Sequence, residues 1–282
     1  MSHMGYISVK EAADKWGITE RVVRGYCADG RVPGAIITGK TWNIPDDAKK
    51  PARKKRMGKI ATDLLTRLRA EKQEQISGGI YHKVQIELTY NSNHIEGSSL
   101  THEQTRYIFE TNTVDAPDGS VNVNDIMETV NHFRCIDLII DQAARPLSES
   151  LIKQLHNILK SGTEDSRKKW FAVGDYKRLP NEVGGLQTTA PEDVPEQMKQ
   201  LLSAYKAKEE ITFDTLLDFH FRFERIHPFQ DGNGRVGRLI LFKECLRNRI
   251  VPFIIEDDMK LFYYRGLKEW EKENLRYSAI RS

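Results

Sequence analysis

Apolar residues recur every three or four positions through most of the chain, which is the spacing of an amphipathic helix. The pattern predicts helices over residues 60–68, 84–95, 123–140, 148–159, 194–205, 213–225, 234–246 and 259–270. Segment 181–191 (NEVGGLQTTAP) departs from it, because its glycines and β-branched residues favour a short β-hairpin. We therefore expect a mainly α-helical body with one small hairpin.

The first 45 residues carry shorter elements. Ser8 and Glu11 form a capping box at the start of one helix, and Thr19 can cap a second helix after a glycine break. Two short apolar runs around residues 38–40 then predict a hairpin that ends before Pro45. This order predicts a winged helix-turn-helix, and the stretches YISVKEAADKWGITERVVRGYCADGRVPG and GKTWNIP resemble heads of the MerR and excisionase type.

Charge is divided unevenly along the chain. The first 58 residues hold 12 Lys and Arg against 6 Asp and Glu, whereas the remainder holds 31 against 34. A basic head favours an anionic partner, and the resemblance implies DNA. Arg21 and Arg24 lie on the second helix, which would enter a groove, and Lys40 lies at the wing tip, where it could meet a phosphate. Small domains of this kind also dock proteins, so that alternative stays open.

The length of 282 residues fits one large domain or two domains. We expect the winged helix-turn-helix over residues 5–45, a polar and basic linker over 46–59, and a helical body over 60–275. Three cysteines lie far apart without a CxxC pair, which predicts buried thiols and neither a disulfide framework nor a zinc site. No stretch is long and apolar enough for a membrane span and no signal pattern begins the chain, so we expect a cytoplasmic protein without membrane contact.

The stretch HPFQDGNGRVGR, residues 227–238, concentrates unusual chemistry. Pro228 should end the preceding helix, and a new helix should begin at Gly234, which places Arg235 and Arg238 on one face of its first turn. Free backbone amides, glycines that allow close approach and two guanidinium groups make a cradle for a polyanion such as a nucleotide triphosphate.

Two other interpretations of this stretch are weaker. Residues 232–237 satisfy GxGxxG, the dinucleotide-binding pattern, but that pattern follows an apolar strand in a βαβ unit, and here a charged helix precedes it. A simple interhelical turn would explain the glycines, but it has no need of Asp231, Asn233 and two arginines together. We retain the polyanion cradle.

Two residues beside the cradle have chemistry of their own. Asp231 offers a hard carboxylate oxygen of the kind that Mg²⁺ takes together with phosphate oxygens. The ordinary pKa of a histidine is about 6.5, so much of His227 would be neutral at pH 7 and able to take a proton from an attacking hydroxyl. A lone histidine near a helix end more often packs or caps, but these neighbours favour a base.

The whole stretch resembles the signature of the Fic family, His-x-Phe-x-Asp/Glu-Gly-Asn-Gly-Arg-x-x-Arg. The resemblance implies a mostly helical domain that transfers a nucleotide monophosphate, usually AMP from ATP, to a Ser, Thr or Tyr hydroxyl of a protein and releases pyrophosphate. It implies that His227 is the catalytic base, that Asp231 holds Mg²⁺, and that Arg238 positions the γ-phosphate. Phe229 would anchor the loop in the core. By the same resemblance the phosphate-binding residues are Gly232, Asn233, Gly234 and Arg235.

The predicted hairpin matches the family's flap, which holds the backbone of the target as an added strand. The resemblance assigns this role to Gly185, Leu186, Gln187 and Thr188. Upstream, the run GDYK places Lys177 where the family usually has an arginine. Tyr263 and Tyr264 fall where family members carry a tyrosine near the nucleotide, although buried helix aromatics are common.

A further match lies upstream, at SNHIEG, residues 92–97. It resembles the family's inhibitory helix, Ser/Thr-x-x-x-Glu-Gly/Asn, and predicts such a helix over about residues 86–97. The resemblance implies that Ser92 and Glu96 belong to an inhibitory element and that Glu96 pairs with Arg238. One guanidinium group cannot clamp the γ-phosphate at the same time, so ATP would bind unproductively.

The resemblance to the Fic family implies an autoinhibited protein adenylyltransferase with ATP as co-substrate, Mg²⁺ as cofactor, and a protein hydroxyl as target, the chain itself included. DNA is an expected partner of the head, and a homo-oligomer stays open. Two alternatives remain. One is a DNA-binding transcriptional regulator whose body only senses nucleotide, and the other is a hydrolase that removes AMP from a modified protein with Glu96 orienting water.

Overall fold

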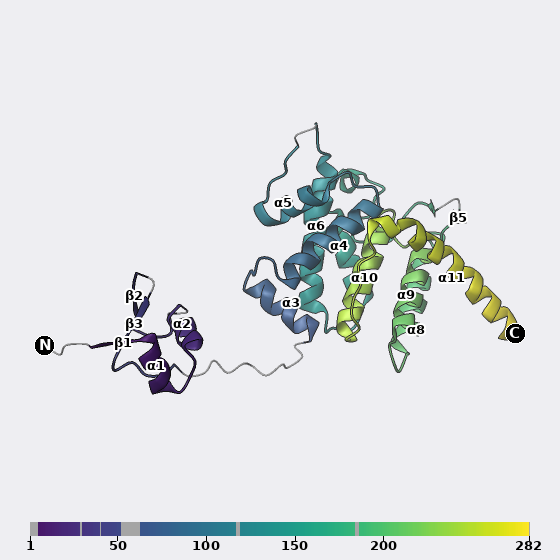
Figure 1. Cartoon of the computed structure of the whole chain (residues 1–282). Helices are drawn as coiled ribbons and strands as arrows, with labels where there is room; N and C mark the ends of the chain where they lie inside the picture. The colour runs from purple at the N-terminus through teal and green to yellow at the C-terminus, as the bar shows by residue number, and fades with distance from the viewer. Residues whose placement is uncertain are drawn as a thin grey trace. The chain divides into compact units, whose positions relative to one another are not determined.

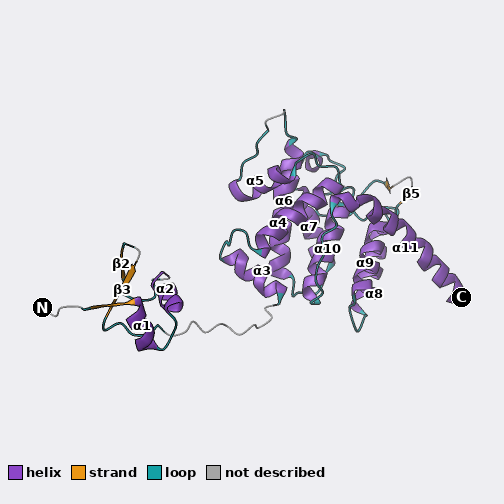
Figure 2. Ribbon diagram, viewed as in Figure 1, coloured by secondary structure: helices purple, strands orange, loops and turns teal. Residues whose placement is uncertain are grey.

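The structure is a computed structural model that describes residues 5–28, 30–39, 41–51, 63–116, 119–183 and 186–281, without the side chains of residues 186 and 271–281. The chain divides into two compact units, Met1–Ala61 and Thr62–Ser282, which we call the head and the body. The head combines helices and strands, whereas helices make up most of the body (Figure 1, Figure 2).

The head contains two helices and a three-stranded antiparallel sheet. In chain order its elements are β1 (Tyr6–Ser8), α1 (Val9–Trp16), α2 (Glu20–Ala28), β2 (Ile36–Thr38) and β3 (Thr41–Pro45). The predicted capping box is confirmed: Ser8 Oγ accepts from the Glu11 amide at 3.2 Å, and the Ser8 amide donates to the Glu11 carboxylate at 2.8 Å. The two helices pack a small apolar core against β3 around the buried Trp16, Val23 and Ile44.

Strand β1 was not predicted from the sequence. Its three residues are too few to show an alternating pattern, and its partner is distant in the chain, since Ile7 pairs with Ile44 of the central strand β3. The predicted hairpin is present as β2 and β3, with Ile37 opposite Trp42. Lys40, at its tip, lies outside the described residues.

The body is mainly helical, as predicted. Its elements are α3 (Leu64–Gln73), α4 (Ile80–Ile95), α5 (His102–Thr111), α6 (Val123–Gln142), α7 (Glu149–Lys160), the 3₁₀ turn η1 (Asp165–Arg167), β4 (Glu182–Val183), β5 (Leu186–Gln187), α8 (Val194–Lys206), α9 (Phe213–Ile226), α10 (Asn233–Arg247), the 3₁₀ turn η2 (Asp257–Met259) and α11 (Lys260–Arg281). The expected hairpin over 181–191 is therefore present as β4 and β5, with Val183 opposite Leu186.

Helix α5 was missed. It has a complete capping box, in which Thr101 Oγ1 accepts from the Gln104 amide at 3.1 Å and the Gln104 side chain accepts from the Thr101 amide at 3.0 Å. Its buried residues, however, are Thr105 and Ile108, so one of the two core positions is polar. The apolar spacing that marked the other helices is therefore absent here.

Helix α10 lies at the centre of the body, packed against α9, α6, α4 and α7 (Figure 1). Apolar residues such as Val236, Leu239 and Phe242 bury one part of it, but its charged Arg235 and Arg238 are also only 4% exposed. A helix buried all round fixes the position of its own N-terminus, and therefore of the loop that leads into it. The three cysteines are buried free thiols, as expected.

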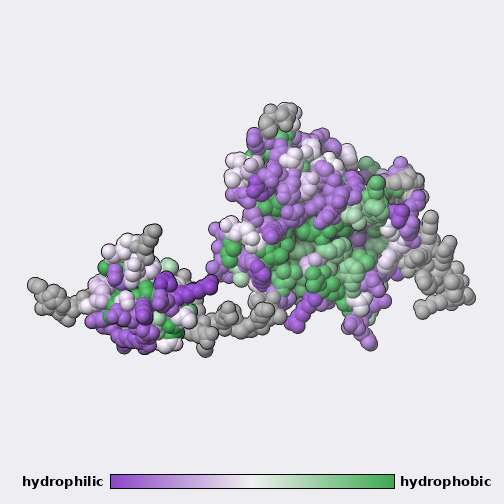
Figure 3. Space-filling model, in the orientation of Figure 1, coloured by the Kyte–Doolittle hydropathy of each residue, from purple (hydrophilic) through white to green (hydrophobic). Residues whose placement is uncertain are grey.

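The surface of the body is not uniformly polar. Figure 3 shows a broad apolar area at the centre of the face in view, with polar side chains around it. Exposed large apolar residues gather towards the end of the chain, among them Val251, Phe253, Leu261 and Phe262. None of the helices within the described ranges combines the length and apolar character that crossing a membrane requires.

Candidate active site

The stretch 227–238 forms a tight connection between α9 and α10. His227 ends α9 in the left-handed conformation (φ 51°, ψ 61°), and Gly232 begins α10 in the same region (φ 81°). Asn233 clamps the loop, because its Oδ1 accepts from the Phe229 amide and its Nδ2 donates to the Phe229 carbonyl, both at 2.8 Å. The Phe229 ring is fully buried. The loop is therefore fixed by the two hydrogen bonds between Asn233 and Phe229 and by the burial of the Phe229 ring.

His156 on α7 packs against this loop. Its ring stacks on Phe229 with the centroids 4.0 Å apart and the planes 5° from parallel. Its Nδ1 accepts from the Gly174 amide (2.9 Å), which leaves the proton on Nε2 to be donated to the Asp231 carbonyl (3.2 Å). Burial, reinforced by Lys160, lowers the pKa of His156 to about 3, so the ring is neutral and serves as a scaffold.

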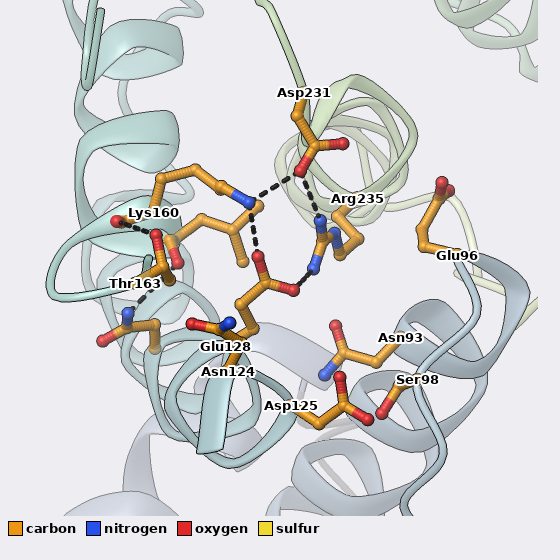
Figure 4. A network of polar contacts seen from close by, with 12 residues as sticks. Asn93, Glu96, Ser98, Asn124, Asp125, Glu128, Lys160, Thr163, Asp231 and Arg235 are labelled. Atoms are coloured by element: carbon orange, nitrogen blue, oxygen red, sulfur yellow. Dashed lines mark hydrogen bonds and ion pairs between the residues drawn. The ribbon is translucent and has the colours of Figure 1, made fainter. Parts of the chain in front are cut away.

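Asp231 belongs to a network of charged side chains that joins it to Lys160, Glu128 and Arg235 (Figure 4). Lys160 Nζ on α7 lies 2.6 Å from Asp231 Oδ2, 2.5 Å from Glu128 Oε1 on α6 and 3.0 Å from Asp165 Oδ2. Arg235 on α10 pairs with Glu128 Oε2 through Nη1, and with Asp231 Oδ2 at 3.3 Å through Nη2. Lys160 and Arg235 are therefore bridged twice, once by each carboxylate.

The network keeps Asp231 ionised. Burial acts to raise the pKa of Asp231, but Arg235 and Lys160 outweigh it and hold the pKa well below its ordinary value. The contacts of this carboxylate to both cations use Oδ2, and the side chain is about half exposed. Mg²⁺ commonly uses one or two protein carboxylates together with phosphate oxygens and water, so Oδ1 of Asp231 suits that role. Among the described residues no group of three or more His, Cys, Asp or Glu side chains forms a metal cage.

Lys160 and Glu128 were not singled out from the sequence. Lys160 follows Ile152 and His156 at four-residue spacing, so it lies on the apolar face of α7 and is only 1% exposed. The sequence did hold one sign of a buried charged site: a lysine lies on the apolar face of the helix, one turn after a histidine. Nothing in the local pattern of α6 marks Glu128 as its partner.

The side chains of the predicted inhibitory element meet Arg238. The carboxylate Oε1 of Glu96, at the C-terminal cap of α4, lies 2.7 Å from Arg238 Nη2. Ser92, one turn earlier, accepts from Arg238 Nε through its hydroxyl and from Nη2 through its carbonyl, both at 2.9 Å. A β-carbon at Gly234 would lie only 2.2 Å from Glu96 Oε1, so the carboxylate rests against the first turn of α10. The helix itself begins at Ile80, six residues before the expected start.

The His227 imidazole is neutral in its surroundings and can therefore accept a proton. Burial and then the ammonium group of Lys177 lower its pKa to about 4, while the Glu224 carbonyl and the carboxylates of Glu96 and Asp231 act in the opposite direction. At pH 7 the ring is therefore uncharged and can accept a proton.

The hairpin lies against the loop between α9 and α10. Asn181, just before β4, donates from Nδ2 to the Phe229 carbonyl at 3.2 Å, and Thr188, just after β5, donates from Oγ1 to Asn181 Oδ1 at 2.5 Å. Gln187 is exposed. Of the other predicted flap residues, Gly185 and the side chain of Leu186 lie outside the described part of the chain.

The two tyrosines on α11 differ in their surroundings. The Tyr263 hydroxyl forms a hydrogen bond with His220 Nε2 at 2.7 Å. Burial raises the pKa of Tyr263, and the charge of Arg238 opposes that rise. Tyr264 is 40% exposed.

In the head, Arg21 is exposed and Arg24 pairs with Glu20 at 2.7 Å on the same helix.

The fold is that of a helical Fic-type domain. Residues 146–244 match the model of the Fic/DOC family. The resemblance seen in the sequence is thereby confirmed.

Known proteins similar to the chain agree with this assignment. "Protein adenylyltransferase Fic" of Drosophila willistoni is 29% identical over 219 residues, which cover 74% of this chain and 40% of that protein. The protein of the same name from Drosophila grimshawi is 28% identical and covers 74% and 41%. The chain thus spans about two fifths of the length of these curated relatives.

Solved structures show the same fold. A Fic domain containing signaling protein from Bacteroides thetaiotaomicron VPI-5482 matches with a TM-score of 0.60 and 28% identity, covering 72% of this chain and 80% of that one. A Fic family protein from Desulfovibrio desulfuricans G20 matches with a TM-score of 0.56 and 23% identity, covering 74% and 65%.

Proposed function

We propose that the body is a protein adenylyltransferase that moves AMP from ATP to a hydroxyl group of a protein, with the chain itself among the candidate targets. The observation that carries the proposal is the arrangement of the loop: a neutral His227 stands at the end of α9, directly before the glycine-rich N-terminus of α10 and its two buried arginines. Backbone amides and guanidinium groups stabilise phosphate charge, and the imidazole supplies the base. Two relatives are named protein adenylyltransferase.

In this mechanism His227 takes the proton of the target hydroxyl as its oxygen attacks the α-phosphorus of ATP. A new P–O bond forms to the target, the bond between the α-phosphorus and the bridging oxygen breaks, and pyrophosphate leaves with that oxygen. The amides of residues 232–235 and the guanidinium group of Arg235 would hold phosphate oxygens. Asp231 would hold Mg²⁺, which would neutralise phosphate charge when bound.

Arg238 and Glu96 would restrain this reaction. Arg238 is the residue proposed to position the γ-phosphate, and its Nη1 is buried without a hydrogen-bond partner among the described residues. Its other nitrogens are engaged by Glu96 and Ser92. A γ-phosphate and the Glu96 carboxylate compete for the same cation and repel each other, so binding one in place disfavours the other.

The test is transfer of label from α-labelled ATP with Mg²⁺ to protein. The full chain is compared as wild type, Glu96→Gly, and Glu96→Gly with His227→Ala. Glu74→Gly is a matched control, because Glu74 caps α3 with the same φ of −86° that Glu96 has at the end of α4. Label in Glu96→Gly alone is the expected result. No label in any variant, with nucleotide binding measured separately, refutes adenylyl transfer.

Removal of AMP is a second candidate for the same site. The Glu96 side chain is 27% exposed, so its carboxylate could also orient a water molecule towards an AMP–protein bond. The two functions respond oppositely to one change. Glu96→Gly should increase transfer, but it should abolish hydrolysis of a modified protein.

For the head we propose contact with DNA through α2. The exposed Arg21 on this helix and the basic charge of the first 58 residues support it. Binding of the full chain to duplex DNA should weaken steeply with salt, and Arg21→Glu should reduce it. Salt-dependent DNA binding without nucleotide transfer, even in Glu96→Gly, would favour the regulator that only senses nucleotide.

A further inference from the structure

A buried lysine without an acidic partner lies at the base of the hairpin. Lys177 is 3% exposed, and its ammonium group donates to two neutral oxygens, Asn181 Oδ1 at 2.7 Å and Thr188 Oγ1 at 2.5 Å. Within the described ranges no carboxylate forms an ion pair with it, and burial lowers its pKa to about 8. Buried lysines are normally paired, so this one needs an explanation.

The segment that begins with Lys177 runs along the loop between α9 and α10, residues 227–232, and forms several hydrogen bonds to it. The Lys177 amide donates to the Pro228 carbonyl at 2.9 Å, and the Leu179 amide donates to Gln230 Oε1 at 3.2 Å. Asn181 donates to the loop through Nδ2, while its Oδ1 accepts from both Lys177 and Thr188. Lys177 and Asn181 therefore join the two ends of the hairpin to the residues that follow His227.

The charge of Lys177 also acts on His227. It is the largest contribution to the lowered pKa of His227 after burial. The groups that oppose it are the carboxylates of Glu96 and Asp231 and the Glu224 carbonyl. A carboxylate paired with Lys177 would cancel most of its effect, so the absence of such a partner lets the ammonium group act on the imidazole.

We propose that Lys177 is a positioning residue that couples the target-docking hairpin to the base: it fixes the hairpin on the loop between α9 and α10 and holds its positive charge close enough to act on the His227 imidazole. The proposal rests on the proposed function, in which a protein target docks on the hairpin and His227 is the base. A target strand added to the hairpin would then be held in register with His227 by the same side chain that tunes it.

The test uses the full chain with Lys177→Met, Lys177→Arg and, as a control, Lys208→Met. Lys208 is exposed beyond α8, so removing its charge changes the composition equally without touching the loop. Two readouts need no activity: the titration of the His227 imidazole by NMR, assigned with His227→Ala, and amide hydrogen exchange of Leu179 and Thr188.

In Lys177→Met the midpoint of the His227 titration should rise by about one pH unit. The Leu179 and Thr188 amides should exchange about fivefold faster, because the hydrogen bonds that hold their segment are weakened. Lys177→Arg keeps the charge and should keep the titration of the wild type. In the Glu96→Gly background, the acidic limb of the pH profile of kcat/KM should move upward with the His227 titration.

Unchanged titration and unchanged exchange in Lys177→Met would overturn the coupling, even if transfer were lost. A shift in Lys177→Arg as large as in Lys177→Met would also overturn it, because the charge would then not be the cause. If both changes occur but Glu96→Gly itself transfers no label, the coupling stands and adenylyl transfer is refuted.

Discussion

Replacing Lys160 by methionine tests how much the buried charge network holds the site together. The Lys160 side chain is 2% exposed and neutralises three carboxylates from separate parts of the body, those of Glu128, Asp165 and Asp231. Methionine fills nearly the same space but supplies no charge. Among the described residues Glu128 would keep Arg235 alone as a cationic partner, and Asp231 would lose its closest cation.

The expected loss in the free energy of unfolding depends on how well water can solvate the carboxylates that lose Lys160. Removing one partner of a buried ion pair costs about 3–5 kcal/mol. Asp231 and Asp165 are 49% and 28% exposed and can be rehydrated, whereas Glu128 is 15% exposed. We therefore expect the lower end, about 3 kcal/mol. For a unit of this size 1 kcal/mol changes Tm by about 2–4 °C, so Tm should fall by about 6–12 °C.

The assay is thermal unfolding of the body at pH 7 by calorimetry, with Lys153→Met as the matched control. Lys153 lies two turns earlier on α7 and also contacts two carboxylates, those of Glu149 and Asp175, but its side chain is 29% exposed. Surface pairs contribute about 0–1 kcal/mol, so the control should lower Tm by less than about 4 °C. Equal effects of the two substitutions would refute the reasoning.

The pH dependence of the same difference is a second check. Opposing the effect of burial, Lys160 helps to lower the pKa of both Asp165 and Asp231 in the folded protein. Depressed carboxyl pKa values stabilise the fold above the unfolded value of about 3.9, and this contribution is lost as the pH falls through the folded values. The difference in Tm between wild type and Lys160→Met should therefore shrink below about pH 4.

Three further substitutions test neighbouring contacts. Ser92→Ala removes one hydrogen bond to the charged Arg238 guanidinium group, worth about 1.5–3 kcal/mol, so label transfer should rise at least about tenfold over wild type and stay below that of Glu96→Gly. Gly237→Ala places a β-carbon 2.2 Å from Glu224 Oε1, and calorimetry should show a loss of about 1–3 kcal/mol from overpacking. Burial raises the pKa of Glu224 to about 8 in the folded protein, against an unfolded value of about 4.3, so wild type loses stability as the pH rises between these values. Because glutamine does not titrate, the Tm of Glu224→Gln relative to wild type should increase from pH 5 to pH 8; a constant difference would refute an uncharged Glu224.

The part of the site that could be predicted lies in one continuous stretch. Residues 227–238 set the end of α9, the loop and the start of α10 through local chemistry, namely a proline, a glycine at the new helix and two arginines on one turn. The pairing of Glu96 with Arg238 was anticipated only from the family resemblance, because the two residues lie on helices far apart in the sequence.

The remainder depends on tertiary contacts that no local pattern encodes. Lys160 and Glu128 meet because α6 packs on α7, and each alone resembles an ordinary charged helix residue. The role of His156 depends on Phe229 lying against it at 4.0 Å. The short strand β1 forms only through its pairing with β3, which comes after both helices of the head.

The conformation of His227 places two demands on one residue. Its φ of 51° belongs to the left-handed region, which costs a side-chain-bearing residue about 1–2 kcal/mol and which helix ends usually assign to glycine. A glycine here would relax the backbone and remove the imidazole. A screen that selects only for heat resistance should therefore enrich His227→Gly and discard the chemistry, so stability-guided engineering of this chain needs to hold position 227 constant.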